Sequence, residues 1–392
     1  MAEAGEEGTR SIFKNTADLI LRIDLKEVLH SDKAISSSEP CYFLCSYNWR
    51  RCLEPSIYVP GAPRKWSPHP LPITLTRDCP TSPEEQQYHP IPTYHFEPVF
   101  RALTAVNSDF RFDDVDLVTN RNNLRKLLQW VEGAARRDFR IDLDIVNDTL
   151  FMTRWEANNS VLRSGSHNPA YGSNFEKFSS NYQEDLVDST DHHRVIHYTL
   201  GALKCVVRSE VDAYYVKVGE PQSLTGLVAD APRSASTKNY PVTSTDNYKP
   251  TEVLHRGCGI PTAATLEIKS CQERCRLDGF MPQLWFSRTP RIMIGYHREG
   301  TFTRVQEWDA GSRFLAWELQ HQENLRKLVG LIAELKRIVR ATKAPCAIIY
   351  QKNRRSKKIQ PALRVYRRVE TMPVLPGALI EQHWNRGLPS SA

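Results

Sequence analysis

The sequence predicts an α+β fold in which mixed, mainly antiparallel β-sheets are flanked by helices. Paired runs rich in β-branched and aromatic residues, separated by turn residues, indicate β-hairpins. One long stretch in the C-terminal half has apolar residues at helical spacing. No internal repeat is visible, which agrees with a mixed class.

The N-terminal third is expected to hold two helices and one extended stretch. Apolar residues at helical spacing predict a short amphipathic helix over 18–29. The segment 55–92 is rich in proline, which lacks the backbone donor that helices and central strands need, so we expect an extended loop there. A second helix is predicted to begin after Asn120, with Arg121 in its first turn.

The remaining elements are mostly strands. Two hairpins are expected, over 138–156 with a turn at Asn147 and over 194–217 with a turn at Gly201. Between 219 and 262 the chain is dense in Ser, Thr, Pro and Gly, so we expect a long inserted loop. The other predicted elements are strands at 264–270, 291–297, 302–308, 346–350 and 362–369, and a helix at 316–341.

Composition is that of a soluble globular protein. The 392 residues carry 52 Lys plus Arg against 45 Asp plus Glu, a net charge of +7, with 40% hydrophobic residues. No run approaches the ~18 apolar residues of a membrane-spanning helix, and the start MAEAGEEGTR lacks the apolar region of a signal peptide, so no membrane association is expected. Nine cysteines without a dense framework favour a reducing compartment, cytosol or nucleus.

Acidic residues on the predicted strands carry the chemistry. Glu210 and Asp212 are two positions apart, and so are Glu267 and Lys269, so each pair is expected to share one face of a sheet. Carboxylates gathered together need a cation, and hard oxygen ligands select Mg²⁺ or Mn²⁺. A lysine beside them can stabilise an attacking water or a phosphate oxygen, as in a metal-dependent phosphodiesterase. The arrangement resembles the core of the PD-(D/E)xK nucleases.

The order of several short motifs extends this resemblance. They are Arg121 in VTNRNNLRKLL, Glu176 in GSNFEKF, then SEVDAYY, LEIKS and Gln283 in MPQLWF. Together they resemble the DXO/RAI-type decapping exoribonuclease family. The resemblance makes Glu176, Glu210, Asp212 and Glu267 direct or water-mediated metal ligands, joined by the backbone carbonyl of Ile268. It gives Lys269 and Gln283 the task of positioning water and phosphate, and Arg121 that of binding RNA phosphate.

The same resemblance implies a function. It indicates a divalent-metal-dependent hydrolase of RNA 5′ ends that removes incomplete or NAD caps or 5′ pyrophosphate, with 5′→3′ exonuclease activity in some members. It also implies mRNA quality control in the nucleus or also the cytoplasm, and a 5′→3′ exoribonuclease as a partner. The expected organisation is an N-terminal segment 1–40, a single nuclease-like domain 41–371 carrying the insert 219–262, and a tail 372–392.

Other interpretations stay open. The chain can instead be a non-catalytic partner that stabilises an exoribonuclease, or a DNA nuclease on the same core. His255, Cys258, Cys271 and Cys275 have spacings that suit zinc, although the series lacks a second tight CxxC. The basic cluster at 352–358 can contact RNA, direct nuclear import or be merely solvated. No GxSxG, Walker A or GxGxxG pattern supports a serine hydrolase, a P-loop NTPase or a dinucleotide-binding fold.

Overall fold

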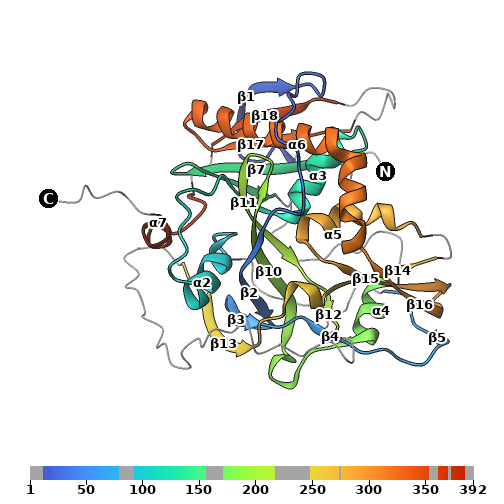
Figure 1. Ribbon diagram of the computed structural model, residues 1–392. Helices are drawn as coiled ribbons and strands as arrows, with labels where there is room; N and C mark the ends of the chain where they lie inside the picture. Colours follow the sequence, from blue (N-terminus) through green and yellow to red (C-terminus); the bar gives the residue numbers. More distant parts are fainter. Residues whose placement is uncertain are drawn as a thin grey trace.

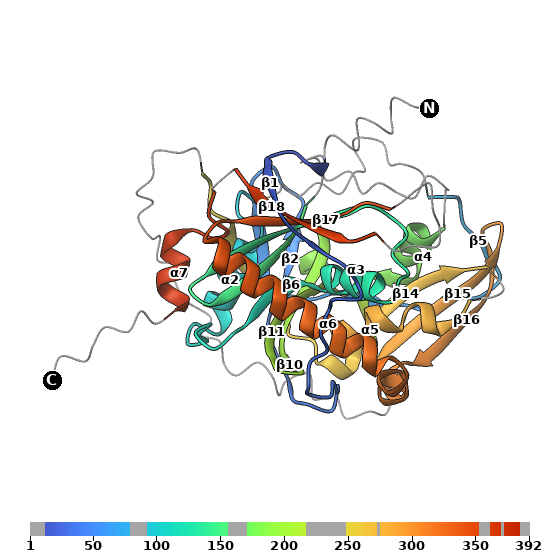
Figure 2. The same ribbon diagram turned by 90° about the horizontal axis from the view of Figure 1, so that it is seen from above.

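Two twisted β-sheets, called sheet A and sheet B, organise the molecule (Figure 1). The computed structural model describes residues 12–78, 92–155, 171–216, 248–272, 275–352, 361–369 and 372–384. Within that part of the chain, sheet A has 11 strands and sheet B has 7. Figure 2 shows sheet B to one side of sheet A, with the long helix α6 (Phe314–Thr342) running from one toward the other.

Sheet A contains both predicted hairpins and strands from both ends of the chain. In spatial order its strands are β1 (Thr16–Ile23), β18 (Leu363–Arg368), β17 (Cys346–Tyr350), β7 (Phe139–Val146), β8 (Thr149–Arg154), β6 (Leu117–Asn120), β11 (Leu203–Glu210), β10 (Ser189–Leu200), β2 (Cys41–Arg50), β3 (Ser56–Gly61) and β13 (Glu252–Gly257). Three of the pairings, β11–β6, β6–β8 and β13–β3, are parallel, and the others are antiparallel.

Sheet B contains the strand of the LEIKS motif at its centre. Its strands, in spatial order, are β5 (Ile73–Thr74), β16 (Thr301–Asp309), β15 (Arg291–Arg298), β14 (Thr265–Cys271), β12 (Ala213–Tyr214), β4 (Arg64–Trp66) and β9 (Ser180–Asn181). The β14–β15 and β12–β4 pairs are parallel. Together the two sheets confirm the expected mixed, mainly antiparallel fold class.

The helices cover the sheets in layers. They are α2 (Glu97–Val106), α3 (Arg121–Val131), α4 (Gly172–Ser179), α5 (Met281–Ser287), α6 and α7 (Gly377–His383). One large apolar core joins α3, α5 and α6 to faces of both sheets. A second core packs α2 and α7 on the other face of sheet A, and a third packs α4 on the outer face of sheet B. Helices α3 and α5 therefore lie where the two sheets approach each other.

Most predicted elements are confirmed. The two hairpins are β7–β8 and β10–β11, with Asn147 and Gly201 in turns at positive φ. The strands after residue 264 and the long helix form within a few residues of their expected bounds. Helix α3 begins at Arg121, as its apolar spacing predicts.

The predicted helix over 18–29 is wrong. Residues Thr16–Ile23 form strand β1, which pairs antiparallel with β18 at the edge of sheet A. Leu19, Ile20 and Leu21 form a short continuous apolar run, and periodicity alone does not separate a strand from a helix in such a run. Pairing with β18 gives the backbone of β1 its hydrogen-bond partners.

Two predicted loops contain strands. The proline-rich stretch includes β3, β4 and β5, and β3 accommodates Pro60 because β2 pairs only with Ile57 and Tyr58, before the proline is reached. The predicted insert 219–262 includes β13, which pairs in parallel with β3. Most of that insert, at 217–247, lies outside the described residues, as do four residues of the basic cluster, at 353–360.

Segments near both ends contact the central part of the chain. Strand β1 joins sheet A, and the Leu379 and Trp384 side chains of the C-terminal segment are buried in the α2 core. The domain boundaries expected at residues 40 and 371 stay a prediction. Among the helices of the described residues, none combines the length and the apolar character needed to cross a membrane.

Candidate functional site

Strand β14 places Glu267 and Lys269 together, and strand β12 brings Asp212 beside them. Ala213 of β12 pairs with Leu266 of β14, so the preceding residue, Asp212, lies next to Glu267 and Ile268. The backbone N–H of Ile268 donates a hydrogen bond to Asp212 Oδ2 at 2.9 Å. The antiparallel pairing of two short strands thus fixes two carboxylates and one lysine in a small volume.

Lys269 is the centre of this cluster. Its ammonium group donates to Glu267 Oε1 and to the carbonyl oxygen of Ile268, the latter at 3.0 Å, and lies 3.4 Å from Asp212 Oδ2. Burial alone would lower the pKa of Lys269, but the Asp212 and Glu267 carboxylates raise it instead. The ammonium group therefore stays charged and neutralises part of the acidic cluster.

The two carboxyl groups respond to this environment in opposite directions. Burial, followed by the charge of Glu267, raises the pKa of Asp212 well above its usual range, against the effect of Lys269. Burial also acts to raise the pKa of Glu267, but Lys269 and then Arg121 lower it. The opposite shifts follow from two like charges in one buried site, where ionisation of one carboxyl opposes ionisation of the other.

Gln283 and Arg121 complete the network from two helices. Gln283, on α5, donates its amide to Glu267 Oε1. Arg121 is the first residue of α3, and its Nη1 lies 3.4 Å from Glu267 Oε2 and donates to the Glu210 carbonyl oxygen at 3.3 Å. The helix thus begins with a cation turned toward the carboxylates, where it offsets their charge.

Arg125 belongs to this network but was not predicted from the sequence. Its guanidinium donates to Gln283 Oε1 at 2.9 Å, and burial followed by repulsion from Arg121 lowers its pKa. The one signal in the sequence was its position four residues after Arg121, which places both side chains on one face of α3. Ser287 also went unnoticed; its Oγ lies 3.5 Å from Arg121 Nη1.

The prediction that Glu210 and Asp212 lie in one strand is wrong. Strand β11 of sheet A ends at Glu210, and the chain enters sheet B at Ala213. Because the chain passes from sheet A to sheet B at Val211 and Asp212, the side chains there do not alternate between two faces as they would in one strand. The change of sheet still brings the two acids near each other, since the charge of Glu210 raises the pKa of Asp212.

Glu176 lies on the short helix α4, next to the edge of this cluster. Its charge raises the pKa of both Asp212 and Lys269. Six of the eight predicted site residues form one hydrogen-bonded network, which Glu210 joins through its backbone carbonyl, and the charges of Glu176 and Glu210 act on it as well. The six are Arg121, Asp212, Glu267, Ile268, Lys269 and Gln283.

The oxygen atoms of this cluster suit a hard divalent ion, but the Lys269 ammonium group already lies among them. Asp212, Glu267 and the Ile268 carbonyl offer only oxygen atoms, the ligand type of Mg²⁺ and Mn²⁺. The Lys269 ammonium contacts these same three groups. As the side chains stand, no group of three or more His, Cys, Asp or Glu in the described ranges is arranged to hold a metal ion. By the chemistry of their oxygen donors, these residues fit a divalent ion.

The alternative zinc series is not brought together as a site. His255 and Cys258 belong to or follow strand β13 of sheet A, whereas Cys271 ends strand β14 of sheet B. Cys275 lies beside Cys271, and burial followed by this neighbouring thiol raises the pKa of Cys275 to about 12. Within the described residues, these four side chains form no metal-binding group.

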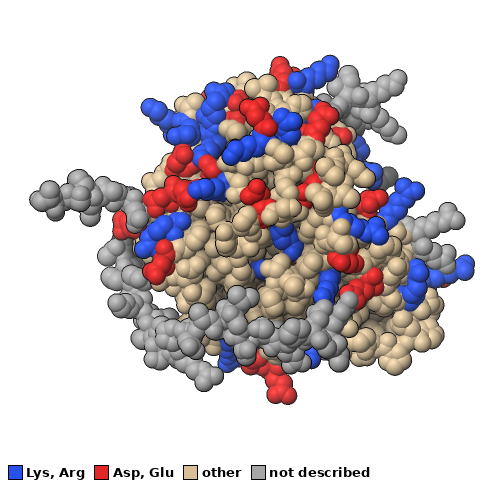
Figure 3. Space-filling view, in the orientation of Figure 1, with Lys and Arg blue, Asp and Glu red and all other residues tan. Residues whose placement is uncertain are grey.

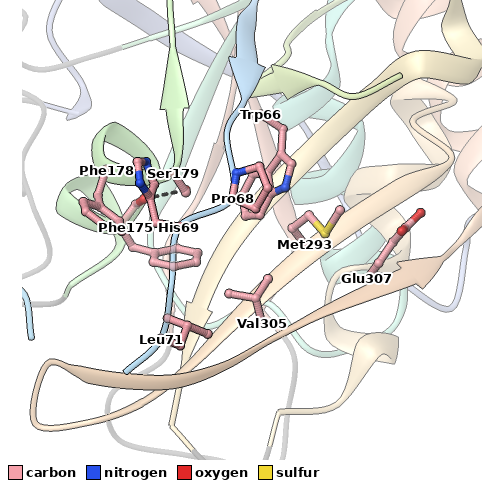
Figure 4. A pocket seen from close by; sticks show the side chains of 10 residues that line it. All are labelled: Trp66, Pro68, His69, Leu71, Phe175, Phe178, Ser179, Met293, Val305 and Glu307. Carbon is pink, nitrogen blue, oxygen red and sulfur yellow. Dashed lines mark hydrogen bonds between the residues drawn. The ribbon is translucent and has the colours of Figure 1, made fainter. Parts of the chain in front are cut away.

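An apolar cavity of about 260 Å³ lies on the opposite face of sheet B (Figure 4). Residues from β4, α4, β15 and β16 line it, among them Trp66, Phe178, Met293 and Glu307. Met293 packs in the outer core with Ile268, whereas its neighbour Ile292, which pairs with Glu267, packs in the core between the sheets. This cavity is therefore separate from the carboxylate cluster.

Charge on the visible face is mixed. Figure 3 shows Lys and Arg atoms interleaved with Asp and Glu atoms over the upper part of the molecule, with wide uncharged areas between them. Among the described residues visible on this face, Lys and Arg form no continuous basic surface. Two of the three cationic groups of the site, Arg121 and Arg125, come from one face of α3, and the third, Lys269, comes from β14.

Sequence comparison finds one family match. Residues 18–384 match the model of a family described as a domain of unknown function, DUF8563. No curated protein matches the sequence.

Structural comparison finds similar folds among solved Rai1 structures. Rai1 of S. pombe is 14% identical with a TM-score of 0.54, over 89% of this chain and 99% of that one. Rai1 of Scheffersomyces stipitis is 11% identical with a TM-score of 0.55, over 93% and 99%. Rai1 of Candida albicans in complex with pU5 and Mn²⁺ is 11% identical with a TM-score of 0.51, over 86% and 92%. These likenesses show a shared fold, and the resemblance expected from the motifs is confirmed at that level.

Proposed function

The chain belongs to the DUF8563 family, whose description names no activity, so from its site we propose that it is a divalent-metal-dependent hydrolase of RNA 5′ ends. The observation that carries this proposal is the contact of Lys269 with Glu267, Asp212 and the Ile268 carbonyl on one short strand pair. Acidic oxygens and a lysine held in this way are what a metal-dependent phosphodiesterase needs.

The similar structures support the substrate class. Solved Rai1 structures include complexes with pU5 and Mn²⁺, with 3′-FADP, and with (3′-NADP)⁺ and calcium. Those ligands are an RNA 5′ end and dinucleotides with a pyrophosphate link. We therefore propose for this chain the removal of incomplete caps, NAD caps or 5′ pyrophosphate, with 5′→3′ exonuclease activity as a second reaction on the same site.

We propose the residue roles that the motif resemblance implies, and the contacts within the site support them. Glu176, Glu210, Asp212, Glu267 and the Ile268 carbonyl would hold Mg²⁺ or Mn²⁺, which supplies charge neutralisation and a more acidic bound water. Lys269 and Gln283 both touch Glu267, so they can position the attacking water and the scissile phosphate beside it. Arg121, next to the same carboxylate, can pair with a phosphate of the RNA backbone.

The test is a cleavage assay on matched RNAs that carry a 5′-monophosphate, a 5′-triphosphate, an unmethylated cap or an NAD cap. We expect Mn²⁺- or Mg²⁺-dependent release of the 5′ group by the full chain and its loss in Glu267→Gln. A folded wild-type protein that cleaves none of these RNAs would instead favour the non-catalytic role beside a 5′→3′ exoribonuclease. Cleavage of DNA alone would favour the DNA nuclease.

Location and partner are part of the same proposal. A hydrolase of faulty 5′ ends acts where RNA is made and checked, so we propose the nucleus as its main site, in mRNA quality control. A 5′→3′ exoribonuclease can degrade the monophosphorylated product, which makes such an enzyme the proposed partner. Fractionation and co-purification of the full chain test both points.

A further inference from the structure

Two arginines outside the carboxylate cluster are almost completely buried. Arg194 on β10 is 3% exposed, and Arg288, which directly follows α5, is 6% exposed. Burial lowers the pKa of Arg194 to about 10 and also lowers that of Arg288, but a guanidinium still carries its charge at neutral pH. Because a buried charge is costly unless it has hydrogen-bond partners and an opposite charge nearby, each of these side chains needs a partner.

Neither guanidinium has acceptors for all of its nitrogen atoms within the described residues. Arg194 donates through Nη2 to the hydroxyl of Thr262, whereas its Nε and Nη1 are buried and meet no acceptor. Arg288 donates through Nη1 to the carbonyl oxygen of Trp285, and its Nε is likewise buried without an acceptor. Three buried nitrogen atoms from two side chains are therefore available to a ligand that accepts hydrogen bonds.

Aromatic rings, rather than carboxylates, surround the two cations. The guanidinium carbon of Arg194 lies 5.4 Å from the centroid of the Phe43 ring, and that of Arg288 lies 4.4 Å from the centroid of the Tyr198 ring. Glu318 on α6 acts on Arg288 through its charge, whereas no acid of the described residues acts on Arg194. Two cations near one carboxylate leave an excess of positive charge in the interior.

The parallel pairing of β14 with β15 brings the surroundings of the two arginines together. Leu266 of β14 lies opposite Arg291 of β15, so the amino ends of these strands are neighbours. Thr262, which accepts the hydrogen bond from Arg194, lies three residues before β14. Arg288 lies three residues before β15. Both guanidiniums therefore lie at the same end of this strand pair.

Cys41 is a second point at which the two side chains meet. It pairs with Tyr198 across β2 and β10, and Arg288 stacks on the Tyr198 ring. Burial raises the pKa of the Cys41 thiol, while the charges of Arg288 and then Arg194 oppose this rise. Cys41 is partly exposed, so the space beside both guanidiniums is within reach of small ions from solvent.

We infer that Arg194 and Arg288 form a binding site for a small free oxyanion, of which inorganic phosphate is the best fit. Guanidinium N–H groups pair strongly with phosphate oxygens, and a tetrahedral ion offers oxygen atoms to donors that come from different directions. The bound ion joins β10 of sheet A to the amino ends of β14 and β15 of sheet B, and so stabilises the contact between the sheets. The inference is independent of the proposed hydrolase, because neither arginine belongs to that site.

Titration of the full chain with inorganic phosphate, at constant ionic strength and without divalent metal, tests the site. We expect a saturable rise of the unfolding midpoint. In Arg288→Met the affinity for phosphate should fall by about tenfold or more, since a charge-assisted hydrogen bond is lost. Without phosphate this variant should unfold at the wild-type midpoint or above it, because an apolar side chain replaces a buried charge.

Arg304→Met is the matched control. Arg304 also stacks on an aromatic ring, 4.1 Å from the centroid of Tyr296, but it is exposed, so its variant should respond to phosphate like wild type. Arg121→Met should respond like wild type as well. If Arg121→Met loses the response and Arg288→Met keeps it, phosphate binds beside the carboxylate cluster and the inference is overturned. A tighter response to adenosine monophosphate than to phosphate would equally contradict a closed site for a small ion.

Labelling of Cys41 gives a readout that needs no variant. A maleimide reagent with peptide mass spectrometry should modify Cys41 several-fold more slowly at saturating phosphate, because the ion lies beside the thiol. Cys52, which is also partly exposed but lies between β2 and β3, is the internal control and should be labelled at an unchanged rate. A wild-type chain that phosphate does not stabilise overturns the inference, and so does labelling of Cys41 that phosphate leaves unchanged.

Discussion

Arg125 donates a hydrogen bond to the side-chain oxygen of Gln283 at 2.9 Å, which leaves the amide nitrogen of Gln283 to face Glu267. The two residues come from different helices, α3 and α5, which lie side by side where the sheets approach each other. Without the guanidinium, only the hydrogen bond to Glu267 orients the amide of Gln283. Arg125 is therefore a positioning residue for the proposed site.

Arg125→Met is expected to lower kcat by about tenfold while changing KM little, since one hydrogen bond that orients Gln283 is lost. The neighbouring variant Lys126→Met is the control. Steady-state cleavage of the best RNA substrate measures both. The combination with Gln283→Ala should be no worse than Gln283→Ala alone, because Arg125 acts through Gln283. Independent losses that multiply would contradict this role.

Lys269→Met should separate metal binding from turnover. The Lys269 ammonium contacts the three groups proposed as metal ligands, so its removal leaves their negative charge unneutralised. We expect Mn²⁺ to bind Lys269→Met at least as tightly as it binds wild type in calorimetry, and to raise the unfolding midpoint of this variant more. Turnover should fall by about a hundredfold or more.

The control for this variant is Lys204→Met. Lys204 also pairs with an acid, Asp114, but it is an exposed residue at the start of β11. Its removal should change neither Mn²⁺ binding nor turnover. If Lys269→Met lost Mn²⁺ binding altogether, the lysine would be part of the ion's site rather than its competitor, and the proposed arrangement of ligands would be incorrect.

Local pattern was enough to predict the elements that carry the site, but not how they meet. The alternation of LEIKS predicted that Glu267 and Lys269 share a face, because both lie within one strand. Glu210 and Asp212 were predicted to lie in one strand, which is wrong because the chain leaves sheet A between them. No period within SEVDAYY marks that change, since only the pairing of Ala213 with Leu266 decides it.

The two edge strands of sheet A, β1 and β13, were also not predicted from the sequence. Residues 18–23 form β1 because β18, more than three hundred residues later in the chain, offers a free edge. Strand β13 forms for the same kind of reason beside β3. Contacts between residues so far apart in sequence leave no signal in a short window, and an apolar run of this length suits a helix and a strand equally.

Asp144 should make folding stability depend on pH. It is buried on β7, and burial raises its pKa to about 6 in spite of Arg368, whose Nη1 lies 2.9 Å from Asp144 Oδ2. A carboxyl whose pKa is raised by folding binds its proton more tightly in the folded state. Its contribution is therefore most favourable below about pH 4 and is lost as the pH rises through about 6.

Asp144→Asn removes this titration. Two pKa units correspond to about 3 kcal/mol, so the free energy of unfolding of the variant should rise relative to wild type by about 1–3 kcal/mol between pH 4 and pH 7. Arg368 keeps a second acid in the variant, since its Nε lies 3.5 Å from Asp142. Urea unfolding of both proteins across this range measures the difference. A difference that stays constant with pH would show that Asp144 does not titrate there.

Gly295 links the packing of sheet B to the position of Glu176. A Cβ at Gly295 would overlap the ring of Phe175, which is stacked on Phe302 with 4.5 Å between ring centroids. Phe175 precedes Glu176 on α4, so a ring forced away from β15 moves the helix that carries this acid. Gly295→Ala should therefore lower the free energy of unfolding by about 1–3 kcal/mol, as overpacking does, and reduce cleavage as well.

Gly259→Ala is the control, because nothing lies within 4 Å of a Cβ at that position. The stringent test is Gly295→Ala combined with Phe175→Leu. The smaller side chain makes room for the added methyl group, so the double variant should recover part of the stability that Gly295→Ala loses. If the losses of stability caused by the two changes simply add, the methyl group is accommodated elsewhere and the Phe175 ring does not transmit strain to α4. Recovery of both stability and cleavage would show that packing on the outer face of sheet B controls the position of Glu176.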